Sequence, residues 1–283
     1  MFPIIANFGR ITIYSYGFFI SLAIIVSFFI ANRRIKKLGL TTDDLLDLLL
    51  YLLIGCIIGA KLLFILTNNF MYYLNNPLEI FLSGGTGFSF FGIIPAGILI
   101  SWWYARKKKI NFWALLDVLA LSVMMGYAIG RIGCFLNGCC FGLPVNPFLP
   151  SSHVGCVFPH VDSYARYPTQ LFIFAGALIS YFILRWIDRI KKFYGATFSS
   201  FFILYAIVTL VVDFYRDMHR YAPLNLTMSQ YLSILLIPLG IVLLIVFSNT
   251  QTIIQIEGAQ ESKVATVIDN ADFSEEDNEV YID

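Results

Sequence analysis

One short stretch of the sequence places an arginine among glycines and thiols at the end of a long apolar segment. This signature segment, residues 130–142, reads Gly-Arg-Ile-Gly-Cys-Phe-Leu-Asn-Gly-Cys-Cys-Phe-Gly. A guanidinium at membrane depth is costly to bury and usually functional, and its planar fork matches two oxygens of a phosphate. Glycines let a backbone or a ligand approach closely. The segment therefore predicts phosphate recognition by Arg131; the alternative is an arginine that only extends its side chain to the membrane surface.

The composition indicates a membrane protein. The chain has 283 residues, of which 58% are hydrophobic and 13% charged, with a mean hydropathy of +0.76. A soluble globular chain has about 45–50% apolar and about 25% charged residues. One polytopic membrane domain is therefore expected. The net charge of +1 gives no support for a nucleic-acid partner, so we expect none.

About seven apolar segments approach the roughly 20 residues that a helix needs to cross a bilayer. The predicted fold is thus an all-α membrane bundle. The first segment has no cationic stretch before it and no small-residue cleavage site after it, so we expect a retained span and not a cleaved signal peptide. The predicted spans are residues 11–31, 45–66, 88–104, 113–135, 171–187, 198–215 and 231–247.

Basic residues cluster in three loops that fall on one side of the membrane if the spans alternate. They occupy residues 33–37, 106–109 and 185–192. The positive-inside rule makes this side cytoplasmic. The N-terminus is then outside, the C-terminus inside, and the signature segment at the outer face.

Several other polar or glycine-rich stretches open or close spans at this outer face. Each has a structural alternative: an ion pair three residues apart for Asp213 and Arg216, a helix start for residues 166–170 and 227–230, and an aromatic belt for Tyr16. Taken together, they predict one arginine-lined site at phospholipid headgroup depth, in a transferase or hydrolase. The sequence has no Gly-x-Ser-x-Gly elbow, which would indicate a serine hydrolase. None of the three histidines lies in a helical metal motif. The stretches are residues 13–17, 84–92, 166–170, 213–217 and 227–230.

The chain has five cysteines, and four of them cluster around one loop. Cys56 stands alone in an apolar segment and is expected to be an inert packing residue. For Cys134, Cys139, Cys140 and Cys156 we favour packing or a disulfide. A metal site is the weaker alternative, because the spacing lacks paired Cys-x-x-Cys knuckles.

Two regions outside the spans differ in character. Residues 139–168 form the longest connection, which is proline-rich and polar enough to cover a site. Residues 251–283 are acidic with few aromatics, which is typical of a disordered tail. We therefore divide the chain into a transmembrane domain, residues 1–250, and an acidic cytoplasmic tail, residues 251–283.

These motifs, in this order, resemble the prolipoprotein diacylglyceryl transferase family over nearly the whole chain up to about Phe247. Tyr16-Gly17 resembles a tyrosine–glycine pair of its first span, and residues 166–171 resemble its Arg-His-Pro-Ser-Gln-Leu segment. Ser229-Gln230 and Ser233-Ile234 resemble its last helix. Its signature and its sixth-span motif are matched by Asp117, Gly130, Arg131, Gly133, Asn137, Gly138, Gly142, Tyr205, Asp213, Phe214 and Arg216.

The resemblance implies an enzyme of the bacterial inner membrane that acts in lipoprotein maturation. A lipobox cysteine of a preprotein would attack the glyceryl carbon of phosphatidylglycerol, so that glycerol phosphate leaves and a thioether remains. The expected partners are phosphatidylglycerol, the lipobox peptide and membrane lipids, and no metal or organic cofactor is required. The expected catalytic residues are Arg131, Arg216, Asp213 and Tyr16. The expected substrate-binding residues are Gly130, Gly133, Asn137, Gly138, Gly142, Gln170, Tyr205, Ser229 and Gln230.

The chain also departs from the family pattern. Phe91 stands where the family often has histidine, Thr209 where it has a helical arginine, and Ile173 where it has glutamate. Cys134 and Cys139 stand where it often has asparagine and glutamate. The base is left open among Asp213, Asp217, Tyr16, His219 and bulk solvent. Two alternatives remain: a paralogue with another acceptor, or a phospholipid- or peptide-binding protein without catalysis.

Overall fold

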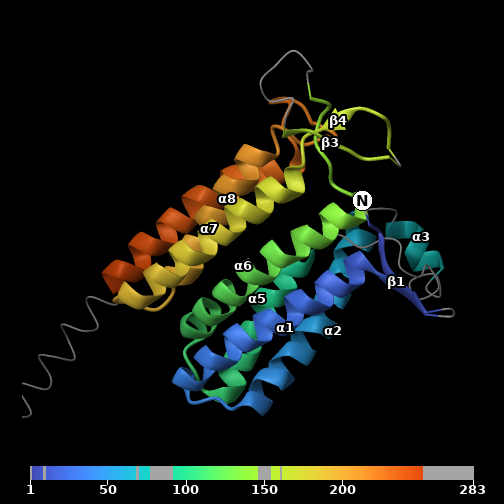
Figure 1. The fold of residues 1–283 in the computed structure, drawn as a ribbon. Coiled ribbons are helices and arrows are strands. Elements are labelled where there is room, and N and C mark those ends of the chain that lie inside the picture. Colours follow the sequence, from blue (N-terminus) through green and yellow to red (C-terminus); the bar gives the residue numbers. More distant parts are fainter. Residues whose placement is uncertain are drawn as a thin grey trace, which may run out of the picture.

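A computed structural model of the chain is a bundle of long helices that run side by side (Figure 1). It describes residues 2–8, 11–67, 70–76, 92–145, 154–159 and 161–250. The predicted tail, residues 251–283, and residues 88–91 of the third predicted span lie outside this part, as do residues 84–87 of the glycine-rich stretch before it. The helices are α1 Ser15–Ile35, α2 Thr42–Thr67, α3 Phe70–Asn75, α5 Ile93–Lys108, α6 Phe112–Asn137, α7 Thr169–Ile190, α8 Ala196–Val212 and a C-terminal helix, Met228–Thr250.

Each of the seven predicted spans corresponds to a helix, so the all-α membrane class is confirmed. Five helices in the described part are long and apolar enough to cross a membrane: α1 (extended by a 3-10 turn to Leu38), α2, α6, α7 and the C-terminal helix. The apolar α8 has 17 residues. Helix α5 has 16 residues and ends on a basic turn of Arg106, Lys107 and Lys108.

Helix α6 lies at the centre of the bundle. It packs against α1, α5, α7 and α8, and Leu121, Met124 and Ala128 form a buried cluster with Ala177 and Leu184 of α7. An all-round apolar helix is expected at such a position because every face meets another helix. The signature segment therefore begins on a helix that packs against four other helices.

Two predicted span boundaries are wrong. Residues Ile11–Tyr14 form strand β2, which pairs antiparallel with β1 Ile4–Phe8, so α1 starts only at Ser15. An alternating run of β-branched and aromatic residues favours a strand. Helix α8 ends at Val212 rather than at residue 215, because the chain leaves the helix at the C-cap Asp213.

Three cations of the basic loops, Arg34, Lys108 and Lys191, pair with carboxylates at one end of the bundle. Asp117, at the start of α6, is buried and accepts from the Lys191 Nζ at 2.6 Å and from the backbone N–H of Gly195 and Phe198 at 2.9 and 2.8 Å. These two N–H groups belong to the start of α8, so Asp117 caps that helix. Further ion pairs at the helix ends are Arg34–Asp188, Lys191–Asp188 and Lys108–Asp44.

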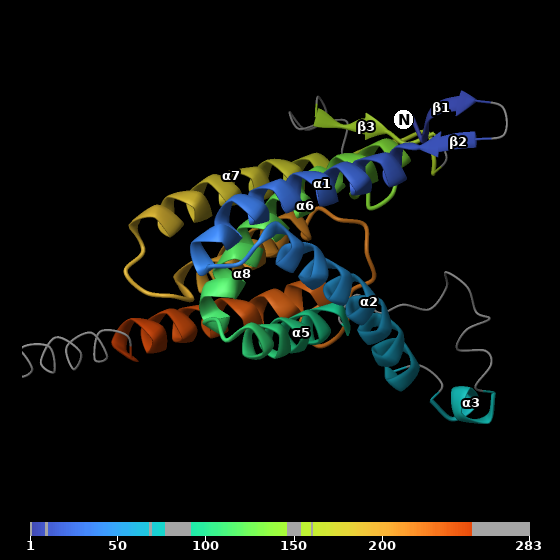
Figure 2. The ribbon, with the colours of Figure 1, turned by 90° about the horizontal axis from the view of Figure 1, so that it is seen from below.

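Small β elements cover the opposite end. Strands β3 Cys156–Val157 and β4 Ala165–Arg166 pair antiparallel, and single bridges join Gly142 to Arg216 and Pro144 to Arg166. Figure 2 shows this hairpin and the β1–β2 hairpin at the same end of the molecule. The signature segment, the start of α7 and the chain after α8 are thus tied together by backbone hydrogen bonds.

Candidate functional site

The signature segment consists of the last turns of α6 followed by a tight turn. Gly138 has φ 75°, in the left-handed region that glycine adopts without steric cost, and ends the helix. The Cys139 N–H then donates back to the Cys134 carbonyl at 3.1 Å. This turn returns the chain toward α6, so that the residues after the helix face those in its last turn.

Arg131 is a half-buried cation without an acidic partner in the described part of the chain. Its Nη2 donates to the Tyr127 hydroxyl at 2.8 Å, and its guanidinium lies 4.7 Å from the centre of the Tyr127 ring. The ring of Tyr205 from α8 packs 5.4 Å from that of Tyr127. A guanidinium carries five N–H donors, so most of its capacity is free for an anion.

Arg216 is the second arginine of the site. Its Nη1 lies 3.5 Å from Oδ1 of the fully buried Asp213, which confirms the ion pair considered from the sequence, although both residues lie beyond the last residue of α8. Asp213 also accepts from the Thr227 hydroxyl at 2.9 Å. The Arg216 Nε is buried and has no hydrogen-bond partner among the described residues.

Arg166 contrasts with these two because its charge is fully matched. It pairs with Asp162 and Asp217 at 2.5 and 2.7 Å and donates to the Gly142 carbonyl at 3.2 Å. Its guanidinium lies 5.0 Å from the centre of the Phe141 ring. Arg166 therefore joins the loops to one another, and we do not expect it to bind a ligand.

The start of α7 fixes the turn of the signature segment. Gln170 is fully buried, and its Nε2 donates to the Cys139 carbonyl at 2.6 Å. The Thr169 hydroxyl donates to the Cys140 carbonyl at 2.8 Å. The Gln170 Oε1 is buried and has no hydrogen-bond partner in the described chain. This oxygen can therefore still accept a hydrogen bond.

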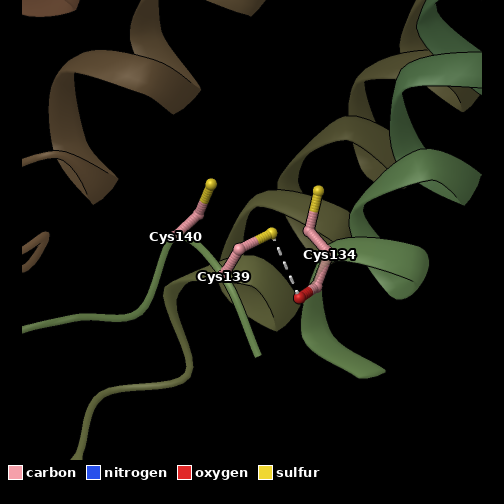
Figure 3. Close-up of side chains that lie close together, drawn as sticks. All are labelled: Cys134, Cys139 and Cys140. Atoms are coloured by element: carbon pink, nitrogen blue, oxygen red, sulfur yellow. Dashed lines mark hydrogen bonds between the residues drawn. The ribbon is translucent and has the colours of Figure 1, made fainter. Parts of the chain in front are cut away.

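Three thiols converge beside the arginines. All five cysteines are free, so of the two favoured alternatives, packing or a disulfide, the disulfide is absent from the described structure. The sulfurs of Cys134, Cys139 and Cys140 lie within 4.8 Å of one another (Figure 3), whereas Cys156 lies outside this group. Hydrogen bonds from Cys134 and Cys139 lower the pKa of the Cys140 thiol, and the guanidinium groups of Arg216 and Arg131 lower it further.

The remaining predicted residues fall into two groups. Tyr16 and Tyr205 lie close enough to Arg131 to interact with it electrostatically, and Tyr16 also interacts with the three thiols. A side chain at Gly142 would meet the Tyr215 carbonyl at 2.6 Å, so this close approach requires glycine. Of the rest, Gly133 packs against Phe19 and Tyr16 of α1. Gly130, Asn137 and Ser229 are partly buried.

Gln230 stabilises the start of the C-terminal helix. Its Oε1 accepts from the Thr227 N–H at 3.0 Å, and the Thr227 hydroxyl accepts from the Gln230 N–H at 3.2 Å, which is a capping box. The Gln230 Nε2 donates to the Leu210 carbonyl at 3.2 Å. Both the oxygen and the nitrogen of its amide therefore form a hydrogen bond within the protein.

Comparison with known proteins agrees with this geometry. The family model described as prolipoprotein diacylglyceryl transferase matches residues 3–246. The chain belongs to the prolipoprotein diacylglyceryl transferase family. Proteins named phosphatidylglycerol–prolipoprotein diacylglyceryl transferase are similar to it: one from Clostridium tetani is 33% identical, covering 85% of this chain and 96% of its own. Those from Rickettsia felis and Geobacter sulfurreducens are each 32% identical, covering 84% and 87% of this chain and 93% and 95% of their own.

Within this diacylglyceryl transferase fold, the departures from the expected family pattern lie on several elements. Thr209 is buried one turn before Asp213, whose N–H donates to its carbonyl at 2.9 Å. Ile173 is buried in α7. Cys134 and Cys139 are two of the three clustered thiols. Phe91 lies outside the described residues.

Sequence reasoning missed Tyr127 as a residue of the transferase site. Tyr127 precedes Arg131 by four positions on α6, the spacing at which helical side chains meet. That spacing was available in the sequence. Conversely, Asp117 matches the family signature but lies on the same helix 14 residues before Arg131, about 21 Å away at 1.5 Å per residue. Asp117 therefore belongs to the paired basic end.

Proposed function

We propose that this protein transfers the diacylglyceryl group of phosphatidylglycerol to the lipobox cysteine thiol of prolipoproteins, in the bacterial inner membrane. The observation that carries the proposal is Arg131, a half-buried cation with no acidic partner among the described residues, in a chain that belongs to this transferase family. A cation left unpaired at such a position is stabilised by an anionic ligand. The phosphate of phosphatidylglycerol is that ligand.

The proposed reaction depends on the two arginines, Arg131 and Arg216. The lipobox sulfur attacks the glyceryl carbon, the carbon–oxygen bond breaks, and its electron pair leaves with glycerol phosphate. Charge grows on the phosphate oxygens during this step, so Arg131 and Arg216 stabilise the transition state more than the substrate. Surrounding lipid and protein exclude water and prevent hydrolysis of the lipid.

The other site residues support this reaction in distinct ways. Asp213 positions Arg216 through their ion pair, and Tyr16 lies beside the thiols and Arg131. Gln170 and Gln230 hold the backbone that shapes the pocket for the substrates. The other residues to which we assign substrate binding are Gly130, Gly133, Asn137, Gly138, Gly142, Tyr205 and Ser229.

The membrane orientation is part of the proposal. The paired basic end faces the cytoplasm and the arginine–thiol end faces the outer leaflet, by the positive-inside rule. The N-terminus is then outside. A reporter fused after Phe247 reports cytoplasmic placement; periplasmic activity of that fusion contradicts the assignment.

Turnover of labelled phosphatidylglycerol with a synthetic lipobox peptide tests the function. The purified protein should form the diacylglyceryl thioether, and Arg131→Ala should not. Arg220→Ala serves as the control, because Arg220 lies near the same end but donates only to the carbonyls of Asp213 and Phe214. Lipid binding without thioether contradicts transfer, and a product on another acceptor identifies a paralogue of different specificity.

A further inference from the structure

The clustered thiols form a set of soft ligands that the arginine mechanism leaves unused. Cys134, Cys139 and Cys140 bring their sulfurs within 4.8 Å of one another, and no nitrogen or carboxylate ligand joins this group in the described residues. Figure 3 shows the three side chains lying close together, two from the turn and one from the end of α6. Thiolates select zinc-like and other soft cations over magnesium or calcium.

Their spacing suits a metal ion better than a disulfide. Zinc–sulfur bonds of about 2.3 Å hold tetrahedral sulfurs roughly 3.8 Å apart, which small side-chain rotations reach from separations of up to 4.8 Å. A disulfide requires about 2.05 Å and a restricted dihedral angle. It would also engage only two of the three thiols.

The cluster is held by a shell of buried hydrogen bonds. Gln170 and Thr169 fix the carbonyls of Cys139 and Cys140, and the Cys139 Sγ lies 3.6 Å from the Cys134 carbonyl. Cys140 has φ 65°, a left-handed conformation that costs energy for a side chain other than glycine. Outer-shell contacts of this kind orient metal ligands, and here they hold the thiols in place before a metal arrives.

The surrounding charge fits a thiolate-bound cation. A divalent ion with three thiolates carries a net charge of −1, and Arg131 and Arg216 both interact electrostatically with Cys140. Arg131 also interacts with Cys134. The two cations therefore balance the complex without a carboxylate, in a region where an isolated charge would be costly.

We propose that these three cysteines bind one zinc ion with an open fourth position, and that the lipobox thiol occupies that position. This inference rests on the proposed transferase function. A metal-bound thiol loses its proton outright, so the ion replaces the base that Asp213 cannot supply while Thr227 and Arg216 engage it. Three protein ligands with one open position is the arrangement of catalytic zinc.

The step balances as follows. The incoming thiol binds the ion and its proton passes to solvent. The bound sulfur attacks the glyceryl carbon, the carbon–oxygen bond breaks, and glycerol phosphate leaves with the electron pair. The new thioether is neutral and a poorer ligand, so it dissociates and reopens the fourth position.

Metal loading alone tests the site. Chelator-treated protein in detergent is incubated with Zn²⁺ or Co²⁺, desalted and analysed for bound metal and for thiolate-to-cobalt absorption. One metal per chain is expected. Cys134→Ser, Cys139→Ser and Cys140→Ser should each lower retention at least tenfold, whereas Cys56→Ser, which alters a thiol that lies against α5, should not. Equal retention by all four variants, or none by the wild type, overturns the site.

Turnover separates this inference from the proposed function. Chelation should lower thioether formation at least tenfold, and Zn²⁺ should restore it in the wild type and in Cys56→Ser. Full activity of the metal-free protein overturns the zinc inference and leaves the transferase function standing. A protein that holds zinc through the three cysteines but makes no thioether overturns the function and keeps the metal site.

Discussion

The two ends of the bundle carry similar charged residues but differ in how many polar groups are left unmatched, although Arg166 and Arg216 also form ion pairs at the arginine–thiol end. At the basic end, Arg34, Lys191 and Lys108 each pair with a carboxylate, and Asp117 receives three hydrogen bonds. At the other end, Arg131 has only a tyrosine as partner among the described residues, and the Arg216 Nε and the Gln170 Oε1 have none.

This difference separates stability from function. A buried charge that is already matched contributes to folding, and removing its partner leaves an uncompensated ion. A buried polar group that is unmatched costs free energy in the free protein and is satisfied when a ligand arrives. Mutations at the two ends should therefore affect different measurements.

The largest effect is expected at the paired end. Asp117→Ala removes one of the two carboxylates that pair with Lys191, together with the cap of α8. Breaking such a buried pair costs about 3–5 kcal/mol. Thermal unfolding in detergent, followed by tryptophan fluorescence, should show a lower midpoint. Turnover per folded molecule should stay near the wild-type value.

Asp43→Ala is the matched control for stability. Asp43 is exposed in the first turn of α2 and makes no ion pair in the described structure. Exposed charges of this kind are worth about 0–1 kcal/mol. Equal destabilisation by the two variants contradicts the view that the basic end is fixed by Asp117.

At the unpaired end, Arg131→Lys should reduce turnover and leave stability unchanged. Lysine keeps the charge but loses the planar fork that grips two phosphate oxygens. Removing one such stabilising group typically costs on the order of 10²–10³ in rate. Steady-state kinetics with labelled phosphatidylglycerol measures this loss. Near-normal turnover of the lysine variant would contradict the proposal that Arg131 binds two phosphate oxygens.

Much of this contrast could be predicted from the sequence because its signals are local. Arg131 stands out as a cation in an apolar stretch, and the basic loops report the opposite end by their charge. The strand at Ile11–Tyr14 was hidden because its four residues run directly into the apolar helix α1, although their β-branched and aromatic side chains favour a strand. Local spacing also does not reveal which distant elements meet.

The thiol cluster and Gln230 show that the sequence does not reveal which distant elements meet. Cys139 and Cys140 reach Cys134 only because Gly138 and Cys140 adopt left-handed backbone conformations. The capping box of Gln230 is visible as Thr-x-x-Gln, but its bond to the Leu210 carbonyl depends on how two helices pack. Tertiary packing decides both roles.

A smaller effect is expected for Gln230→Ala. The change leaves the Thr227 N–H and the Leu210 carbonyl without their partner, which costs about 1–3 kcal/mol. Ser229→Ala, at the neighbouring position, should change stability by less than about 0.5 kcal/mol. If Gln230 acts by supporting the fold, the KM for phosphatidylglycerol stays constant. A raised KM with unchanged stability would instead show a direct substrate contact.

The smallest effect is a gain at Thr209, where the family pattern has an arginine. Thr209 is buried one turn before Asp213, so Thr209→Arg places a second cation within reach of that carboxylate. Sharing Asp213 releases part of the Arg216 guanidinium for the phosphate. We expect thioether formation to rise severalfold, because the added cation acts mainly on the transition state. Phe91→His in the same chain should add to the gain.

The control for Thr209→Arg must account for the steric cost of a larger side chain at this buried position. An added arginine must displace apolar volume around α8, and overpacking typically costs about 1–3 kcal/mol. Thr209→Met adds comparable bulk without charge, so it isolates the steric cost from the electrostatic gain. Both variants are compared with the wild type in a strain depleted of its own transferase. If Thr209→Arg inserts stably but transfers no faster than Thr209→Met, the arginine–thiol end does not lack a cation, and Arg131 and Arg216 already suffice for the phosphate.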